Sequence, residues 1–232
     1  MKTKMVTIGR LRLYCGDAAA IVPQITGQVD CVITDPPYAE RTHQGARTNR
    51  KSADGKRLVP FPSLSDSQFL AAVEQWLAVA GGWVVATVDM RHAALLMDHP
   101  KLVRLGVWVK NNPMPQLTGD RPAQGHETVL VMHSGARRKA WNRGGGPATW
   151  RHNVCNRATV PTEKPLALVR DFVYDFTQPD EMILDPYMGS GTTGAACLLE
   201  GRRFIGIERD PQHFKIAVAR LRNLHETLQV AA

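Results

Sequence analysis

The amino-acid sequence predicts an α/β fold built on a mostly parallel β-sheet. Strand-like and helix-like runs alternate along almost the whole chain, as they do where crossover helices join parallel strands. Two of the strand-like runs end in an acid and a tight turn: "VDCVITDPPY" at residues 29–38 and "MILDPYMGSGTTG" at residues 182–194. Because open α/β sheets bind ligands at the carboxyl ends of their strands, Asp35 and Asp185 are candidate site residues.

Seven strands are predicted from short apolar runs that end at turn residues. They span residues 11–14, 30–34, 83–88, 106–109, 128–132, 181–185 and 204–208. The second reads as a buried central strand, and the two prolines after Asp35 prevent both its continuation and an immediate helix. Asp35 is therefore expected at the end of a strand, beside a stiff turn.

Helices are predicted after four of these strands. They are predicted over residues 65–82, over 162–176, from about residue 192, and from Pro211 to near the end. The first has an apolar face with helical spacing, Asp66 as its cap and Gly81 at its end. In the second, Thr162 is the expected N-cap and Pro165 is tolerated in the first turn.

Composition favours one domain with a polyanionic partner. The chain has 232 residues, of which 44% are hydrophobic, and its formal net charge is +8. That length and hydrophobic content support a sizeable core without disulfides, and the positive charge favours nucleic acid or an anionic membrane surface. The four cysteines form no CxxC pair, and no metal motif is present. No apolar run is long enough to span a membrane, so we expect a soluble, cytoplasmic protein.

Two polar, basic segments interrupt the alternation of strands and helices. Residues 39–62 lack periodicity and are expected to be a mobile loop that leaves directly from the DPPY turn. Residues 134–160 hold five arginines, one lysine and a triple glycine, and are expected to be irregular. A solvated surface is the alternative interpretation of either segment by itself.

The glycine-rich turn after Asp185 favours one particular nucleotide-like ligand. Gly189 and Gly191 would let a ligand approach the backbone, but no lysine follows them as a phosphate-binding loop requires. Asp185 would repel a pyrophosphate and suits a cationic or amino-bearing ligand. The next strand ends in Glu208, which is placed to accept both hydroxyls of a ribose. A sulfonium joined to a ribose describes S-adenosylmethionine.

Taken together, DPPY and "DPYMGSGTT" resemble the amino-methyltransferases of DNA, which methylate exocyclic amines using S-adenosylmethionine. The catalytic motif comes first and the cofactor loop last, an order that resembles the permuted β group of this family. The resemblance extends over about residues 11–222 and includes "LYCGDA", "GVWVKNNP", "HETVLVMH" and "PTEKPLALV". It implies a doubly wound, mostly parallel, seven-stranded sheet of the S-adenosylmethionine-dependent methyltransferase (Rossmann-like) type. It also implies one circularly permuted domain, with a catalytic part at about 11–133 and a cofactor part at about 161–228.

The resemblance assigns roles to individual residues. Asp17 would accept a hydrogen bond near the cofactor adenine, and Thr162 and Lys164 would contact its methionine end. The expected cofactor-binding residues are Asp17, Thr162, Lys164, Asp185, Gly189, Ser190, Gly191, Thr192, Thr193 and Glu208. DPPY more often accompanies adenine N6 than cytosine N4 as the target. Family members more often carry Phe where Tyr187 stands, which is a mild departure.

The reaction explains why these residue types are needed. The target base must leave the duplex, and Tyr38 can stack on it. Asp35 and the backbone carbonyl of Pro36 would accept the two amine hydrogens, so that the nitrogen lone pair turns toward the methyl group. A carboxylate beside an amine that gains positive charge stabilises the transition state more than the ground state. Asp35, Pro36 and Tyr38 are therefore the expected catalytic residues.

Double-stranded DNA is the expected partner, and a homodimer is a further hypothesis because so short a recognition segment reads little DNA. Residues 39–62 are expected to bind phosphates and residues 134–160 to recognise the target sequence. The expected DNA-binding residues are Arg47, Arg50, Lys51, Arg137, Arg138, Lys139, Arg143 and Arg151. Trp141 and Trp150 would pack or, as the less favoured option, fill the gap left by the flipped base. Four alternatives stay open: methylation of cytosine N4, of RNA or of a protein amide, and a DNA-binding regulator without catalysis.

Overall fold

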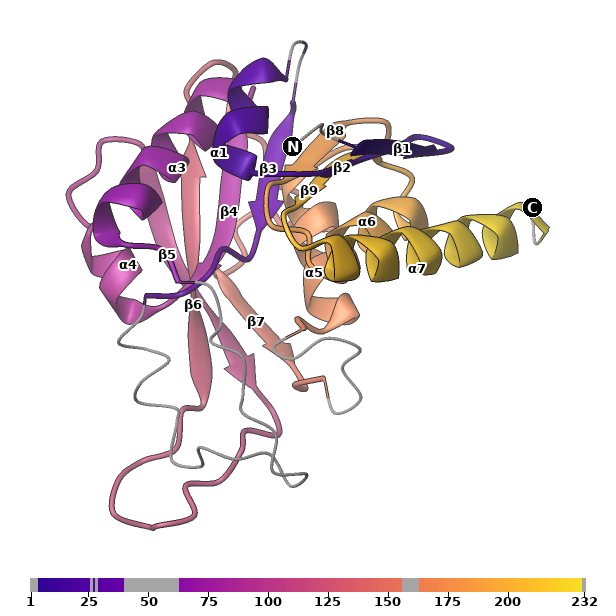
Figure 1. The fold of residues 1–232 in the computed structure, drawn as a ribbon. Coiled ribbons are helices and arrows are strands. Elements are labelled where there is room, and N and C mark those ends of the chain that lie inside the picture. The colour runs from indigo at the N-terminus through magenta and orange to yellow at the C-terminus, as the bar shows by residue number, and fades with distance from the viewer. Residues whose placement is uncertain (1–3, 26, 28, 40–62, 156–162, 231–232) are drawn as a thin grey trace.

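One β-sheet organises the molecule in the computed structural model (Figure 1), which describes residues 4–25, 27, 29–39, 63–155 and 163–230. In these residues the sheet has nine strands in the order β1-β2-β9-β8-β3-β4-β6-β5-β7. The strands are β1 (Lys4–Ile8), β2 (Leu11–Cys15), β3 (Cys31–Thr34), β4 (Trp83–Val88), β5 (Leu102–Lys110), β6 (His126–His133), β7 (Thr149–His152), β8 (Met182–Asp185) and β9 (Arg203–Glu208). The helices are α1 (Ala18–Ile21), the 3-10 turn η1 (Val22–Gln24), α3 (Asp66–Val79), α4 (Met90–Ala94), α5 (Leu166–Phe176), α6 (Thr192–Leu199) and α7 (Pro211–Val230).

The sheet is mixed but mostly parallel, as the sequence predicts. β2, β9, β8, β3 and β4 run parallel to one another in that order, and β7 is parallel to β5. β1 is antiparallel to β2, and β6 is antiparallel to both β4 and β5. All seven predicted strands are present.

The sheet has two strands more than the predicted seven, β1 and β7. β1 forms a hairpin with β2, and β7 lies inside the 134–160 segment that the sequence analysis expects to be irregular. β7 is only four residues long, and Trp150 is its one buried side chain, so it has no apolar alternation to reveal it. Tertiary contacts hold β7 in place: it pairs with β5, and the Trp150 indole donates to the Asp175 carboxylate at 2.8 Å.

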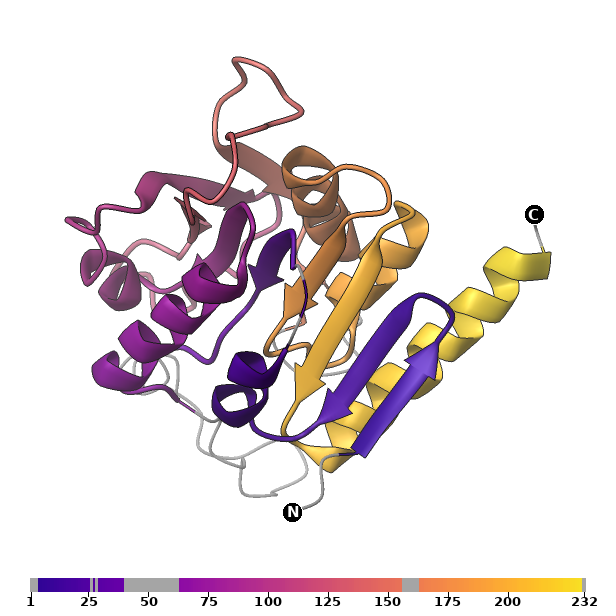
Figure 2. The ribbon, with the colours of Figure 1, turned by 90° about the horizontal axis from the view of Figure 1, so that it is seen from above.

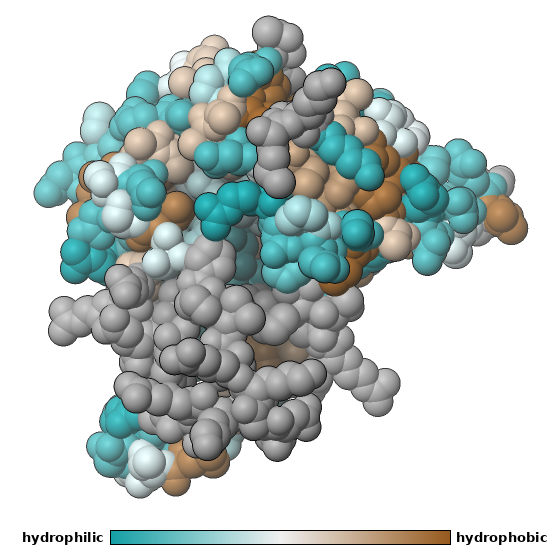
Figure 3. Space-filling view, in the orientation of Figure 1, coloured by the Kyte–Doolittle hydropathy of each residue, from teal (hydrophilic) through white to brown (hydrophobic). Residues whose placement is uncertain are grey.

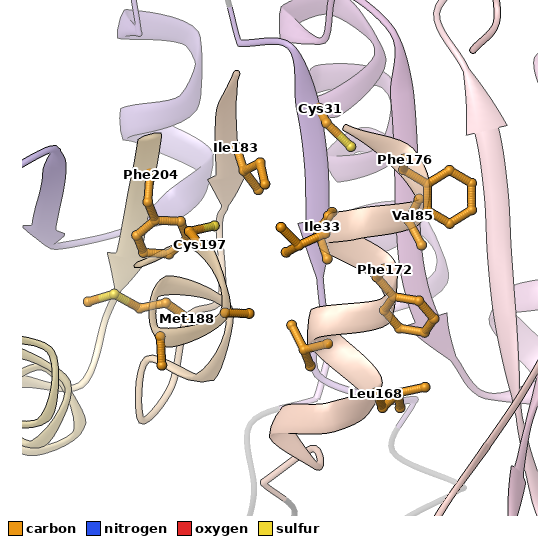
Figure 4. Close-up of a cluster of buried hydrophobic side chains, with 14 of the residues drawn as sticks. Cys31, Ile33, Val85, Leu168, Phe172, Phe176, Ile183, Met188, Cys197 and Phe204 are labelled. Carbon is orange, nitrogen blue, oxygen red and sulfur yellow. The ribbon is translucent and has the colours of Figure 1, made fainter. Parts of the chain in front are cut away.

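Helices cover both faces of the sheet, which makes the fold doubly wound (Figure 2). Successive side chains of a strand point to opposite faces. Cys31 and Ile33 accordingly pack in a core with α5, α6 and α7, whereas Val32 packs in a second core with α1 and α3. Figure 4 shows part of the first core, with labelled side chains from β3, α5 and α6. The near-continuous apolar run of β3 is explained by this burial on two faces.

Two helix starts differ from those expected. The N-cap of α3 is Ser65 rather than Asp66, because its hydroxyl accepts from the Gln68 amide while the Gln68 side chain accepts from the Ser65 amide. Pro165 occupies the N-cap position of α5, and the predicted cap Thr162 lies outside the described residues. The expected mobile loop also lies outside them from residue 40 to residue 62.

The surface of the described part of the chain is largely hydrophilic on the face shown in Figure 3, with hydrophobic side chains scattered between polar ones. Among the residues that the structure describes, no helix is both long and apolar enough to cross a membrane.

Candidate active site

The carboxyl ends of β3 and β8 bring the two motif acids to one edge of the sheet. β3 and β8 are parallel neighbours although about 150 positions separate them in the chain, so both turns open on the same side. The Thr34 hydroxyl donates to Asp185 Oδ1 at 2.7 Å and thereby links the end of β3 to the end of β8. Asp35, the next residue, is close enough to Asp185 for its charge to contribute to the raised pKa of that carboxyl, after burial as the main cause.

Asp185 is a buried carboxylate held by a full set of donors. The Thr193 hydroxyl donates to Oδ2 at 2.6 Å, and the Tyr187 amide donates to Oδ1 at 3.0 Å. Burial raises its pKa to about 6, although the hydroxyls of Thr193 and Thr34 oppose the rise. The ionised form is thus strained in the protein alone, and a cation placed near it would relieve that strain.

The glycine-rich loop has the backbone that its sequence indicates. Gly189 (φ 51°) and Gly191 (φ 84°) are both in the left-handed region, which L-side chains rarely adopt. Gly191 is the N-cap of α6. Glu208 fixes the loop from the next strand, because its Oε2 accepts from the Gly189 amide at 3.0 Å while its Oε1 accepts from the Asp210 amide at 2.7 Å. Burial raises the pKa of Glu208.

A third acid belongs to the same edge. Asp17 caps α1 by accepting from the Ala19 amide at 3.2 Å, and the adjoining Gly16 amide donates to the Glu208 carbonyl at 2.9 Å. Burial, and after it the charge of Asp17, raises the pKa of Tyr187 to about 12. Asp17, Asp185, Glu208 and the glycine loop therefore form one side of the site.

Arg220 of α7 holds this loop, and the sequence analysis missed it. Its guanidinium donates to the hydroxyls of Ser190 at 3.2 Å and Thr192 at 3.1 Å, and it pairs with Glu163 at 2.7 Å. Arg220 is one of several basic residues on a helix with an exposed face, so no sequence pattern distinguishes it.

The other side of the site is a cluster of charged residues around the DPPY turn. Lys164 Nζ lies 2.8 Å from Asp35 Oδ2, and the Thr87 hydroxyl donates to Asp35 Oδ1. The Tyr38 hydroxyl donates to Glu127 Oε2 at 2.7 Å. The turn ends at Ala39, whose amide donates to the buried Asp89 at 2.7 Å.

Lys164 lies against the DPPY turn and Glu127. Its expected contact with the methionine end of the cofactor stays a prediction, and the contacts described here place its ammonium beside Asp35. Burial lowers the pKa of Lys164, but Asp35, Tyr38 and Glu127 raise it more, to well above the usual value. Burial raises the pKa of Asp35, and the negative charge of Glu127 adds to this rise. Lys164 and the Thr87 hydroxyl oppose it.

All five expected DNA-binding residues of 134–160 are exposed, and two of them are also paired with acids. Arg137 pairs with Asp30 at 3.1 Å and with Glu181 at 2.9 Å, and Arg143 lies 3.6 Å from Asp175. The other three expected DNA-binding residues of the segment are Arg138, Lys139 and Arg151. Three more, and one expected cofactor contact, lie outside the described residues: Arg47, Arg50, Lys51 and Thr162.

The two tryptophans of this segment pack, as the favoured interpretation predicts. Trp150 is buried, and its ring meets those of Phe172 and Trp141 edge-on. Within the part of the chain that the structure describes, no group of three or more His, Cys, Asp or Glu side chains is arranged to hold a metal ion.

Solved structures share this fold. The chain aligns over 91% of its length with all of M1.HpyAVI in its complex with S-adenosylmethionine, at a TM-score of 0.68 and 28% identity. A TM-score of 0.70 relates it to the PvuII DNA methyltransferase (cytosine-N4-specific), at 15% identity over 95% of this chain and 93% of that one. The fold and the site thus define the class of S-adenosylmethionine-dependent methyltransferases.

The sequence comparisons define the family within that class. A family model described as DNA methylase matches residues 29–219, and the chain belongs to this family. It is 35% identical to the type II methyltransferase M.Cfr9I of Citrobacter freundii, over 90% of this chain and 87% of that protein. It is 33% identical to the type II methyltransferase M.XycI of Xanthomonas campestris pv. cyanopsidis, over 95% of this chain and 91% of that protein.

Proposed function

We propose that this DNA methyltransferase transfers a methyl group from S-adenosylmethionine to the N6 amine of adenine in double-stranded DNA, at a specific sequence. The observation that carries the proposal is the adjacency of the two motifs at the carboxyl ends of β3 and β8, joined by the Thr34–Asp185 hydrogen bond. A target amine at Asp35 and a methyl donor above the glycine loop would then meet at one edge of the sheet.

The residues on the cofactor side fit S-adenosylmethionine. Asp185 and Glu208 are carboxylates whose pKa values burial raises, so both gain from cationic or hydroxyl partners. Glu208 would accept the ribose hydroxyls, Asp17 would face the adenine, and the left-handed Gly189 and Gly191 keep the loop open for close approach. The remaining assigned contacts are Ser190, Thr192, Thr193, Thr162 and Lys164. When bound, the cofactor supplies an activated methyl group on a sulfonium.

The residues on the target side act on the amine. Asp35 accepts one amine hydrogen and the carbonyl of buried Pro36 accepts the other, which turns the nitrogen lone pair toward the donor. Lys164, 2.8 Å from Asp35, favours the ionised carboxylate. The ionised carboxylate then stabilises the positive charge that develops on the amine. Tyr38 stacks on the extruded base and offsets part of the few kcal/mol needed to unstack it.

The basic residues would bind the duplex around this site. Residues 39–62, with Arg47, Arg50 and Lys51, would contact phosphates. In 134–160, the exposed Arg138, Lys139 and Arg151 are better placed to read bases than Arg137 and Arg143, which are paired with acids. We also propose a cytoplasmic homodimer, in which a second copy widens the DNA footprint; light scattering that shows a monomer with and without DNA would refute the dimer.

Cytosine N4 is the second candidate target, because the matching family joins N6 and N4 amine methylation. The aspartate in the first position of DPPY favours adenine.

One experiment distinguishes the proposal from methylation of RNA, from methylation of a protein amide and from a regulator without catalysis. Purified protein is incubated with tritiated S-adenosylmethionine and with random-sequence duplex DNA, total RNA or a protein extract. Label in DNA alone supports the proposal. Label confined to RNA or protein, or none at all, overturns it.

A further inference from the structure

Glu127 is an acid of the site to which no motif assigns a role, although it contacts both Tyr38 and Lys164. It lies near the start of β6, opposite Trp108 of β5, and its side chain is only 13% exposed. Oε2 accepts the Tyr38 hydroxyl at 2.7 Å and lies 3.3 Å from Lys164 Nζ, while Oε1 lies 2.8 Å from Lys110 Nζ. A buried carboxylate with three such partners has little freedom to move.

The charges of this cluster balance only when Glu127 is ionised. Asp35 and Glu127 supply two negative charges, and Lys110 and Lys164 supply two positive ones. Burial opposes ionisation of Glu127, but the two ammonium groups outweigh it and lower the pKa to about 2. Removing this charge would leave Lys110 without the carboxylate that it pairs with, and Lys164 would lose one of the two anions that fix its position.

The hydrogen bond to Glu127 also sets the orientation of the Tyr38 ring. Rotation about the Cα–Cβ bond would carry the hydroxyl away from Glu127 and break the hydrogen bond, and because a phenolic O–H prefers the plane of its ring, the position of the carboxylate also favours one ring plane. Lys164 Nζ lies 5.2 Å from the ring centroid, so the ammonium takes one face of the ring. The stacking partner that the proposed function requires must therefore use the other face, and Tyr38 is partly exposed.

We propose that Glu127 is a positioning residue for methyl transfer: it anchors the Tyr38 hydroxyl and the Lys164 ammonium, so that the ring presents one fixed face to the extruded base and Lys164 stays paired with Asp35. This inference rests on the proposed function, because it concerns how that same site holds its target. Glu127 itself touches neither the base nor the methyl donor.

The test is a double-mutant cycle of Glu127→Gln and Tyr38→Phe. Methyl transfer from tritiated S-adenosylmethionine to a random-sequence duplex pool gives kcat and KM, and calorimetry gives the Kd for S-adenosylmethionine. Glu74→Gln is the matched control, since Glu74 is an ion-paired but exposed carboxylate on α3, away from the site. Each site variant is expected to lower kcat about tenfold, which is about 1.4 kcal/mol, without changing the Kd of S-adenosylmethionine. The decrease in kcat of the double variant is expected to be much smaller than the product of the two single decreases.

Three results would overturn the inference: kcat of Glu127→Gln equal to that of Glu74→Gln, a change confined to the KM of S-adenosylmethionine, or effects that multiply in the double variant. If Glu127→Gln does not fold, Tyr38→Phe still decides, because it leaves the ion pairs of Glu127 in place: an unchanged kcat rejects the tether, and a loss of kcat with unchanged Kd supports it. Failure of the wild-type protein to label DNA would instead reject the proposed function.

Discussion

When Asp185 is replaced by asparagine, the free energy of unfolding without cofactor should rise with pH relative to that of the wild type. Asp185 is only 3% exposed, and burial raises its pKa from the ordinary 3.8 to about 6. A carboxyl whose pKa is raised by folding binds protons more readily in the folded state. Its favourable contribution is complete below the unfolded pKa and is lost as the pH rises through the folded pKa. Asparagine has the same shape and does not titrate.

The magnitude follows from the difference between the two pKa values. A difference of about 2 units corresponds to about 3 kcal/mol of stability that the wild-type protein loses between about pH 4 and pH 6. Between pH 4.5 and pH 7.5 the free energy of unfolding of Asp185→Asn should therefore rise by about 2 kcal/mol relative to the wild type. The other titrating groups contribute equally to both proteins, so they cancel in the difference between variant and wild type.

Urea denaturation at pH 4.5, 5.5, 6.5 and 7.5, without cofactor, measures this difference. Because the hydrogen bonds from Thr34 and Thr193 change in the variant, the difference in free energy of unfolding at a single pH is not a test. The test is how this difference changes with pH. A difference that stays constant between pH 4.5 and pH 7.5 would refute the reasoning, because Asp185 would then have an ordinary pKa in the folded protein.

Three further predictions concern the cofactor and the DNA. Glu208→Gln should weaken binding of S-adenosylmethionine by about 10- to 100-fold in calorimetry, since a charged acceptor of the ribose hydroxyls is lost; an unchanged Kd would remove Glu208 from the site. Arg220→Gln should weaken the same binding about tenfold by releasing the glycine loop, whereas the exposed Arg222→Gln should not; equal affinities would mean that Arg220 only packs. Arg50→Ala should lower binding to all duplexes alike and reduce its salt slope by about one, while Arg151→Ala should change which sequences are methylated in a random pool; the opposite pattern would exchange the two roles.

The sequence predicts the frame of the site well because each motif residue follows a recognisable strand. Asp35 and Asp185 both end short apolar runs, and their adjacency follows from parallel strands of one sheet. Glu208 was located in the same way, and its carboxylate does reach the glycine loop. The acids at strand ends can therefore be predicted from the sequence, because each one directly follows a recognisable strand.

Other residues of the site lack such a signal. Glu127 is a single acid in an alternating strand, and Arg220 is one basic residue among several on a long helix, so only tertiary packing shows what they contact. The family resemblance assigns Lys164 to the cofactor, and its contact with Asp35 is a further one that only the structure shows. β7 was missed because its stability comes from pairing with β5 and burial of Trp150, neither of which is local to the sequence.

We propose that the DPPY turn and the glycine loop form one site that methylates the N6 amine of adenine in DNA, and one measurement tests this directly. The direct measurement uses S-adenosylmethionine with a deuterated methyl group and a random-sequence DNA duplex, followed by digestion to nucleosides and mass spectrometry, with Asp35→Asn beside the wild type. The prediction is deuterated N6-methyladenine from the wild type and none above background from the variant. Label found only in N4-methylcytosine, or equal label from both proteins, would contradict the claim.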